Sequence, residues 1–509
     1  MRAPLSDPLL MARFQETIAA QVPRRDPSSG RVLDPTPLED LTEALMEFAA
    51  GELRADLSSK NPRVYGKFDS RIAGGSVKVR PAVQIVSEAI GSGRLTRERT
   101  VFEATSGNFG LALAMLGKLD LRVVALVSRK LQPGVIKELG SAGVRLINLD
   151  IDICPAPGFK GDADLLVAKG IASSVRQQLG DAGLGPDAFD AVRGEAEALL
   201  ARQDVISLAK LLAQAYGGYC PEQYDNEMNV RAHETITGPE VDQQLNERGS
   251  SLATFDLVCA LGTGGTATGL SRYAGRVHSR KPVHVVYPLP DQDVAGIRTR
   301  EKARGLRFYS PGEYASENEV DFEKARRLLD FMNGRGHDVG ESGALALYGC
   351  LELIQSGKLR NAVVVIADGA SKYATAPSSS AAGTEVTLQG ARDRRESYSA
   401  VVWTHGALAP NDAGVRAIAS AVGVEERQVR VARVREVQSL LDGSGTPEVF
   451  DAESGRRLLL VCMVGGTSLM VARALAERGI AAESLAGGIT GIPSLRGRPP
   501  LEYLGAAVA

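Results

Sequence analysis

The sequence lacks a long apolar run and an excess of either charge, and each absence argues against a class of protein. No segment approaches the roughly 18 to 20 apolar residues of a membrane span. The N-terminus carries arginines but no apolar stretch of the secretory type. The 509 residues have a formal net charge of −2, so electrostatics gives no reason to expect binding to nucleic acid or to an anionic membrane.

Cysteines are few and scattered. They are odd in number and show no zinc-type spacing; the set is Cys154, Cys220, Cys259, Cys350 and Cys462. We therefore expect free thiols in a reducing, cytoplasmic compartment and no metal site.

What the sequence does have is a regular alternation of short β-branched runs and helical stretches from about residue 64 to residue 373. The runs are apolar for most of their length, as parallel strands are when both faces of the sheet are covered. They include Val101–Ala104, Arg122–Val127, Val144–Leu149, Phe255–Leu261, Val283–Tyr287 and Ala362–Ala367. The alternation predicts an α/β fold with parallel sheets.

Breaks in this alternation predict the domain organisation. Residues 1–60 are expected to form a helical N-terminal extension and residues 61–375 the main domain. A helical insertion is predicted at 155–212, where Ala, Leu, Asp and Glu recur at helical spacing. The Pro-, Ser- and Gly-containing segment 376–398 is predicted to be a linker, followed by a small α/β unit at 399–509.

The segment Gly74–Ala82 contains Lys78 between two glycines and a proline that suits the first turn of a helix. Burial and the positive end of a helix dipole both lower the pKa of a lysine. The segment therefore favours a reactive amine, although a surface lysine at a helix start has the same local pattern.

Two glycine-rich loops follow. Thr105–Gly110 lies between an apolar strand and a helix, and suits a carboxylate, a phosphate or an ordinary strand-to-helix turn. Gly262–Thr266 also follows a strand, and its glycines allow several backbone N–H groups to converge on one phosphate. It lacks the Walker lysine and does not match GxGxxG. Together a lysine, a carboxylate loop and a phosphate loop favour binding of pyridoxal phosphate and an amino acid.

With these segments in view, the chain resembles the cysteine synthase (tryptophan synthase β) family of fold-type II pyridoxal-phosphate enzymes over about residues 60–375. The Lys78 segment matches the family's S-x-K-x-R-x-A. The loop at Thr105 matches T-S-G-N-T-G at all but one position, and the loop from Gly262 matches G-T-G-G-T-x-x-G. The segment His233–Glu240 resembles the family's H-x-x-T-x-G-P-E stretch, and Gln223 and Asn226 stand where the family has its Q-x-x-N pattern.

The resemblance implies a two-subdomain fold, a homodimer and a role for each matching position. Lys78 is implied as the Schiff-base lysine and the acid and base at Cα, and Ser342 as the serine that faces the pyridine nitrogen. The resemblance implies further cofactor contacts at Asn108, Gly262, Thr263, Gly264, Gly265 and Thr266. It implies that the substrate carboxylate is bound by Thr105, Ser106, Gly107 and Gln223.

Three departures leave the substrate open. Val79 replaces an aspartate that commonly follows the lysine, Phe109 replaces a threonine of the substrate loop, and Glu341 replaces a common serine. The Phe109 change removes a hydroxyl and is expected to narrow the pocket.

The C-terminal unit resembles rhodanese sulfurtransferases. Cys462–Ser468 resembles their C-x-x-G-x-S loop, and Leu485–Ile489 matches their L-x-G-G-I ending. A cysteine between a strand and a helix N-terminus is expected to be nucleophilic, whereas a small buried hydrophobic role is the common alternative. Met463 stands where an arginine is common. The unit is thus predicted either to carry a persulfide on Cys462 or to serve docking.

The favoured hypothesis is β-replacement on an activated serine, an O-acyl or O-phospho ester, through an aminoacrylate and with a sulfur nucleophile such as sulfide or a persulfide. Alternatives are β-elimination from a cysteine-like substrate with sulfur passing to Cys462, a diamino-acid synthase with an amine nucleophile, and a catalytically silent scaffold.

Overall fold

The computed structural model describes residues 7–492 apart from 56, 106, 128–132, 150–161, 203, 291, 293, 371–384, 405–410, 442–444, 463–465 and 487. The chain divides into two compact units. The first comprises Met1–Arg99, Leu111–Leu121 and Pro221–Ala374. The second comprises Thr100–Gly110, Arg122–Cys220 and Thr375–Ala509. Cys154 lies outside the described residues.

The first unit is built on a six-stranded sheet within the described residues, in the order β10-β9-β8-β11-β4-β3. All neighbours pair in parallel except β3 and β4. The strands are β3 (Leu38–Asp40), β4 (Arg63–Phe68), β8 (Asp256–Ala260), β9 (Val283–Pro288), β10 (Ser316–Val320) and β11 (Asn361–Ile366). The strands predicted at 255–261, 283–287 and 362–367 are confirmed.

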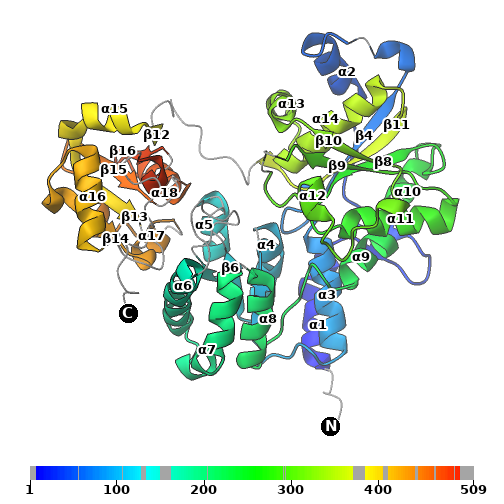
Figure 1. The fold of residues 1–509 in the computed structure, drawn as a ribbon. Helices are drawn as coiled ribbons and strands as arrows, with labels where there is room; N and C mark the ends of the chain where they lie inside the picture. Colours follow the sequence, from blue (N-terminus) through cyan, green and yellow to red (C-terminus); the bar gives the residue numbers. More distant parts are fainter. Residues whose placement is uncertain are drawn as a thin grey trace. The chain divides into compact units, whose positions relative to one another are not determined.

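Helices cover both faces of this sheet (Figure 1). The helices of the first unit are α1 (Pro8–Thr17), α2 (Thr42–Gly51), α3 (Val79–Gly91), α9 (Met228–Ala232), the π-helical η5 (His233–Thr237), α10 (Gly238–Asn246), α11 (Gly265–His278), α12 (Arg300–Ala303), α13 (Phe322–Gly334) and α14 (Glu341–Gln355). Single-turn helices are η1 (Ala19–Gln21), η2 (Ser58–Lys60), η3 (Asp69–Arg71), η4 (Met115–Leu119) and η6 (Pro311–Glu313). A short ribbon pairs β1 (Arg24–Arg25) with β2 (Val32–Leu33).

Strand β11 shows why the runs predicted to be strands are apolar for most of their length. Val363 and Val365 belong to the core beneath α10 and α11, whereas Val364 and Ile366 belong to the core beneath α2, α13 and α14. Because alternate side chains point to opposite faces, a strand covered on both sides must be apolar throughout.

The second unit contains a three-stranded parallel sheet, β5 (Val101–Ala104), β6 (Val123–Val127) and β7 (Arg145–Asn148), in that order. Its helices are α5 (Pro133–Ser141), α6 (Asp162–Asp181), α7 (Pro186–Ala201) and α8 (Val205–Ala215), and α4 (Asn108–Ala114) crosses the unit boundary. Helices α6 to α8 share one core with β5, β6 and β7. The segment predicted as a helical insertion is therefore helical where it is described, and it covers one face of this sheet.

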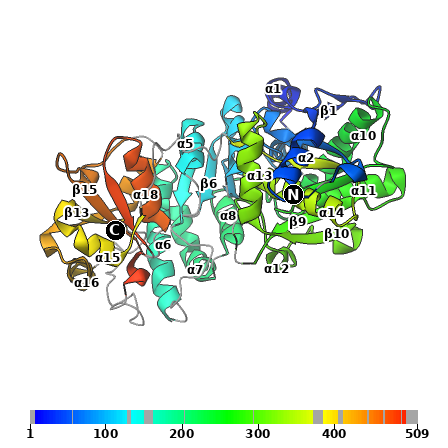
Figure 2. The ribbon, with the colours of Figure 1, turned by 90° about the horizontal axis from the view of Figure 1, so that it is seen from above.

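The second unit also holds a parallel sheet of β12 (Glu385–Val386), β16 (Ala482–Leu485), β15 (Arg457–Val461), β13 (Tyr398–Thr404) and β14 (Val429–Ala432), in that order. Its helices are α15 (Leu388–Asp393), α16 (Asp412–Val422), α17 (Val434–Leu441) and α18 (Gly466–Ala476), with η8 (Arg395–Ser397), η9 (Glu426–Gln428), η10 (Glu448–Phe450) and η11 (Gly488–Gly491). Helices α16 and α18 lie on opposite faces of the sheet (Figures 1 and 2).

Two domain boundaries differ from those expected. Residues 1–60 contain helices α1 and α2, but β3 within them pairs with β4 at the edge of the main sheet. Residues 385–398, expected to be linker, carry β12, which pairs with β16, and α15. In both places a two- or three-residue strand gives too short an alternation to be visible in the sequence.

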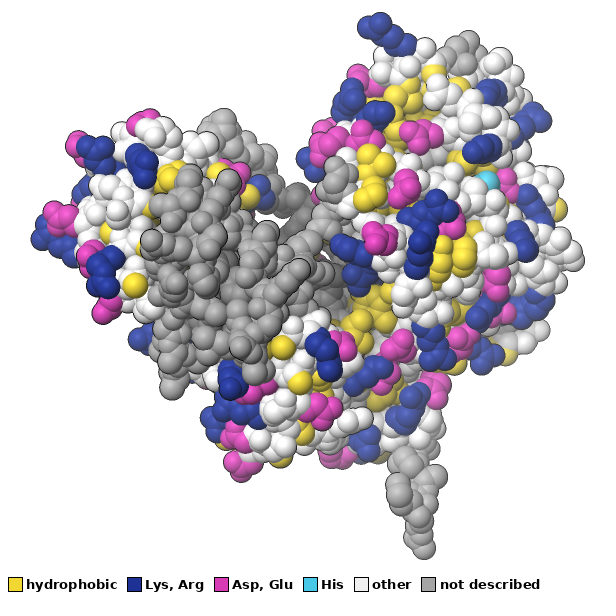
Figure 3. Space-filling model, in the orientation of Figure 1, with side chains coloured by type: hydrophobic (Ala, Val, Ile, Leu, Met, Phe, Trp, Pro, Cys, Tyr) yellow, Lys and Arg dark blue, Asp and Glu magenta, His cyan; other side chains and the backbone are white. Residues whose placement is uncertain are grey.

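Within the described residues, no helix has the length and apolarity needed to cross a membrane. On the face shown in Figure 3, basic and acidic side chains are interspersed over the described surface.

Candidate active site

Lys78 directly precedes α3, in a turn that is tied to the strand at the middle of the main sheet. The Val77 N–H donates to the Ala367 carbonyl oxygen at 2.7 Å, and Ser76 forms an antiparallel bridge with Asp368. These backbone contacts hold the Lys78 side chain at the carboxyl end of β11, where ligands of parallel sheets commonly bind.

The surroundings of Lys78 favour the neutral form of its amine. Burial lowers the pKa of Lys78 to about 8, the Asp368 carboxylate acts in the opposite direction, and the Arg298 guanidinium lowers the pKa further. The residue as a whole is only partly buried. An amine of this pKa is neutral in about a tenth of the molecules at pH 7, so it can act as a nucleophile and as a base.

The loop from Gly262 lies against the Lys78 amine. A Cβ placed on Gly262 would lie 3.6 Å from Lys78 Nζ and 2.7 Å from the Gly296 carbonyl oxygen. Gly264 has a φ of +88°, and its Cβ would lie 2.8 Å from the Phe308 carbonyl oxygen. Only glycine meets both demands. The loop ends at the N-terminus of α11, where free backbone N–H groups can bind an anion.

Asn229, which the sequence analysis did not single out, joins two predicted site segments. Its side-chain NH2 group donates to Thr263 Oγ1 at 2.9 Å and to the Gln223 carbonyl oxygen at 2.7 Å. A Cβ on Gly265 would lie 2.1 Å from Asn229 Oδ1. The only signal was its place three residues after Asn226 in the Q-x-x-N segment.

His233 braces the last threonine of the same loop. Its Nδ1 lies 3.0 Å from Thr237 Oγ1 and its Nε2 lies 3.2 Å from Thr266 Oγ1. Burial and the nearby Arg80 and Lys78 charges hold the pKa of His233 well below its usual value. The imidazole is therefore neutral near pH 7 and bonds both hydroxyls.

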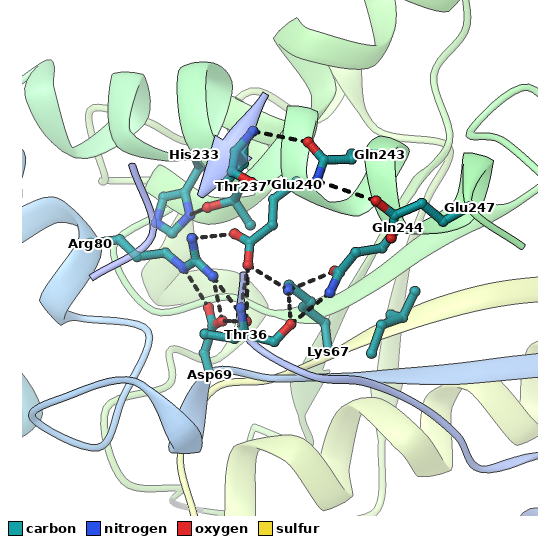
Figure 4. A network of polar contacts seen from close by, with 12 residues as sticks. Thr36, Lys67, Asp69, Arg80, His233, Thr237, Glu240, Gln243, Gln244 and Glu247 are labelled. Atoms are coloured by element: carbon teal, nitrogen blue, oxygen red, sulfur yellow. Dashed lines mark hydrogen bonds and ion pairs between the residues drawn. The ribbon is translucent and has the colours of Figure 1, made fainter. Parts of the chain in front are cut away.

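Arg80, two residues after Lys78, belongs to a buried cluster of charges (Figure 4). Arg80 bonds Asp69 at 2.7 Å and Glu240 at 2.6 Å, and Lys67 bonds the same Glu240 at 2.6 Å. Thr36 donates to Asp69 and to Glu240. Two positive and two negative side chains thus compensate one another, and they fix the first turn of α3 through Arg80, two residues after Lys78.

Ser342 stands in the first turn of α14 and is buried, with 5% of its surface exposed. The Gly340 N–H donates to the Asp368 carbonyl oxygen at 3.0 Å, which ties the start of α14 to the end of β11. Burial raises the pKa of the neighbouring Glu341, and the Asp368 charge adds to this shift.

The predicted substrate loop lies in the second unit. Thr105 Oγ1 accepts hydrogen bonds from the backbone N–H groups of Gly107 at 3.1 Å and Gly110 at 3.0 Å. Asn108 begins α4, and Phe109 is buried, with 2% of its surface exposed. Ser106 lies outside the described residues. The Thr105 hydroxyl therefore shapes the turn itself.

The sequence was compared with known proteins. A family model described as pyridoxal-phosphate dependent enzyme matches residues 35–369, well over half of the chain. The chain belongs to this family. It is 24% identical over 353 residues to cysteine synthase of Staphylococcus aureus (strain Mu50 / ATCC 700699), covering 67% of this chain and 97% of that protein.

The chain is similar to other known proteins over comparable lengths. Cysteine synthase B of Escherichia coli (strain K12) is 28% identical over 321 residues, 61% of this chain and 86% of its own. The solved O-acetylserine dependent cystathionine beta-synthase from Helicobacter pylori gives a TM-score of 0.46 at 20% identity, covering 71% of this chain and 97% of its own.

Pyridoxal phosphate is the cofactor of this pyridoxal-phosphate dependent enzyme family, and the first unit fits it. The Lys78 amine lies against a loop whose crowded glycines leave no room for side chains, at the start of the fourteen-residue helix α11. The loop can hold the phosphate and Lys78 the aldehyde carbon, and the cofactor supplies an electron sink next to the Cα of a bound amino acid.

The family match ends before the C-terminal sheet. There Cys462 follows β15 directly and is fully buried. The Ser468 hydroxyl, in the first turn of α18, lies 3.3 Å from Cys462 Sγ and 2.8 Å from the Ser484 hydroxyl. Met463, Val464 and Gly465 of the predicted loop lie outside the described residues. Among the described residues no cluster of His, Cys, Asp and Glu is suited to a metal ion.

Proposed function

We propose that this enzyme replaces the β-substituent of an O-activated serine by a sulfur nucleophile, and that the activating group is anionic, as in O-phosphoserine. The observation that carries the proposal is the position of Lys78 Nζ, 3.6 Å from the Cβ position of Gly262 in the phosphate loop. A weakly basic amine beside a phosphate loop serves proton transfer at the Cα of an amino acid bound to the cofactor.

In this proposal Lys78 removes the Cα proton, and loss of the β-substituent follows. The incoming nucleophile adds at Cβ, after which Lys78 returns a proton to Cα. Ser342 is assigned to the pyridine nitrogen, where a hydroxyl, unlike a carboxylate, would not stabilise a protonated ring. Asn108 is assigned to the ring hydroxyl. Thr105, Ser106, Gly107 and Gln223 are assigned to the substrate carboxylate.

Arg298 supports an anionic leaving group. Its Nη2 donates to Tyr224 Oη at 3.1 Å, and its guanidinium carbon lies 5.4 Å from the centre of the Tyr224 ring. None of the ion pairs between described side chains includes Arg298. Its positive charge lowers the pKa of Lys78. A guanidinium held by an aromatic ring and free of a carboxylate is suited to a phosphate oxygen.

The test compares two donors. Arg298→Gln should lower kcat/KM for O-phospho-L-serine with sulfide by about 10- to 100-fold, the worth of one hydrogen bond to a charged group, and change kcat/KM for O-acetyl-L-serine by less than about threefold. Arg300→Gln is the matched control, because Arg300 is two residues away and faces Glu317 at 3.5 Å. An equal loss with both donors would reject an anionic leaving group.

The assignment of Lys78 has its own test. Borohydride reduction of the cofactor-loaded enzyme should leave the cofactor mass on the peptide that contains Lys78, and Lys78→Ala should lose both this adduct and the visible absorbance. An unmodified Lys78 in cofactor-saturated protein would reject the reaction and favour a silent scaffold.

A second candidate function concerns the sulfur source. Cys462 at the end of β15, with the Ser468 hydroxyl 3.3 Å from its thiol, supports a rhodanese-like carrier of a persulfide. Its complete burial in the described structure supports the docking alternative. Cys462→Ser should abolish activity with a sulfane donor and preserve activity with free sulfide, whereas equal activity with both would reject the carrier.

The same assays separate the other reactions. Release of sulfide from cysteine would identify β-elimination, and a diamino-acid product would identify an amine nucleophile.

A further inference from the structure

We propose that Asp368 is a positioning residue of this enzyme: its backbone joins the Lys78 turn to the start of α14, and its carboxylate is the negative charge that the Lys78 ammonium faces. The proposal rests on the proposed role of Lys78. Asp368 lies two residues beyond the end of β11, outside every motif used to predict the site.

The backbone of Asp368 makes two contacts of the same kind. It bridges to Ser76, two residues before Lys78, and its carbonyl oxygen accepts the N–H of Gly340, two residues before Ser342, at 3.0 Å. One residue therefore sets the relative positions of the amine and of the hydroxyl assigned to the pyridine nitrogen.

The carboxylate of Asp368 is enclosed. The residue is 1% exposed, and a Cβ on Gly340 would lie 2.2 Å from Asp368 Oδ1. Any side chain at position 340 would displace this oxygen. The packing thus holds a buried carboxylate against the start of α14, where it also acts on Glu341 and raises the pKa of that group after the larger effect of burial.

Three charged or titratable groups from different elements interact electrostatically with Lys78. Asp368 raises its pKa from the end of β11, and Arg298 lowers it from the loop before α12. His233, from η5, is kept neutral by burial and by the nearby positive charges. Asp368 is accordingly the group that favours the ammonium, and Arg298 opposes it.

This balance matters for proton transfer. When Lys78 takes the Cα proton it becomes an ammonium in partly desolvated surroundings, which is costly without an opposite charge. Asp368 stabilises that ammonium until the proton returns to Cα. Burial and the Arg298 charge act against the ammonium, so that Lys78 can give the proton back to Cα.

The proposal is tested on the cofactor-free protein, so that the readout does not depend on turnover. Competitive labelling with acetic anhydride across pH, with mass spectrometry of the Lys78 peptide, gives the midpoint at which this amine loses its proton. Asp368→Asn should move the midpoint about one pH unit lower, since an opposite charge at close range shifts a pKa by about one to three units.

Asp338→Asn is the matched control. Asp338 accepts the Ala370 N–H at 2.9 Å on the segment that follows Asp368, and its substitution should leave the midpoint where it is in the unaltered protein. An unmoved midpoint in folded Asp368→Asn would overturn the proposal.

Further variants and one further measurement separate the effect of the Asp368 charge from misfolding and from failure of the proposed function. If circular dichroism shows that Asp368→Asn does not fold, Asp368→Ser and Asp368→Glu compare a neutral with a charged side chain, and equal midpoints in those two would overturn the proposal. A Lys78 that shifts its midpoint but carries no cofactor after borohydride reduction would reject the proposed function and leave the Asp368 contact intact.

Discussion

Arg80 Nη1 lies 2.6 Å from Glu240 Oε2, and at most 1% of either side chain is exposed. This pair joins the residue two positions after Lys78 to α10, which lies far away in the sequence. Asp69 and Lys67 complete the cluster. The charges that hold the Lys78 helix in place are thus fully shielded from water, and the loss of any one of them leaves its partner charged and buried.

Glu240→Gln should destabilise the protein by about 3 to 5 kcal/mol, because removing one partner leaves Arg80 and Lys67 with uncompensated buried charge. Urea denaturation monitored by circular dichroism measures the free energy of unfolding. Glu247→Gln is the control just beyond the same helix: its pair with Arg31 is exposed, and its loss should cost about 1 kcal/mol or less. Similar losses for both variants would show that the buried cluster is not what stabilises this region.

His233→Gln should weaken cofactor binding about fivefold, because Thr266 in the phosphate loop loses a well-placed partner worth about 1 kcal/mol. Fluorescence titration of the cofactor-free protein gives the dissociation constant. His278→Gln, at the other end of α11 and bonded to Asp242 at 2.8 Å, should leave the constant within about twofold. An unchanged constant for His233→Gln would count against a role for this bridge.

Gly264→Ala should destabilise the loop by about 1 to 3 kcal/mol, since alanine is strained at a φ of +88°, and its methyl group would collide with the Phe308 carbonyl oxygen. Cofactor affinity should fall with it. Gly275→Ala, inside the helix α11 that follows Gly264, meets nothing within 4 Å and should instead stabilise by about 0.5 to 1 kcal/mol. Thermal unfolding and cofactor titration of the two variants check the opposite signs.

The pH dependence of cofactor attachment is set by Lys78. Because burial lowers the pKa of Lys78 to about 8, and only the neutral amine attacks the aldehyde, the rate of attachment should rise with pH and level off above pH 8. Below pH 8 it should fall about tenfold per unit. Stopped-flow absorbance measures this rate. A rate that keeps rising to pH 10 would mean that the attacking amine has an ordinary lysine pKa.

Much of the fold was predictable because it depends on local alternation of side chains. Parallel strands buried on both faces must be apolar, and β5 has the bounds that its apolar run predicts. The cofactor was predictable because each loop predicted to bind it is a single short segment of the sequence. The short strands β3 and β12 were not predictable, since two or three residues carry no periodicity and their pairing depends on an open edge elsewhere in the chain.

The sequence by itself determined the α/β class, the lysine with its two glycine loops, and hence pyridoxal phosphate as cofactor, because each resides in a short contiguous segment whose backbone and side chains define the chemistry locally. Only the tertiary structure decided that Asp368, Arg298 and Asn229 belong with them. The strand order β8-β11-β4 brings distant segments together at the carboxyl ends of the strands. Charges and hydrogen bonds between such segments act through space, and no local sequence pattern predicts them.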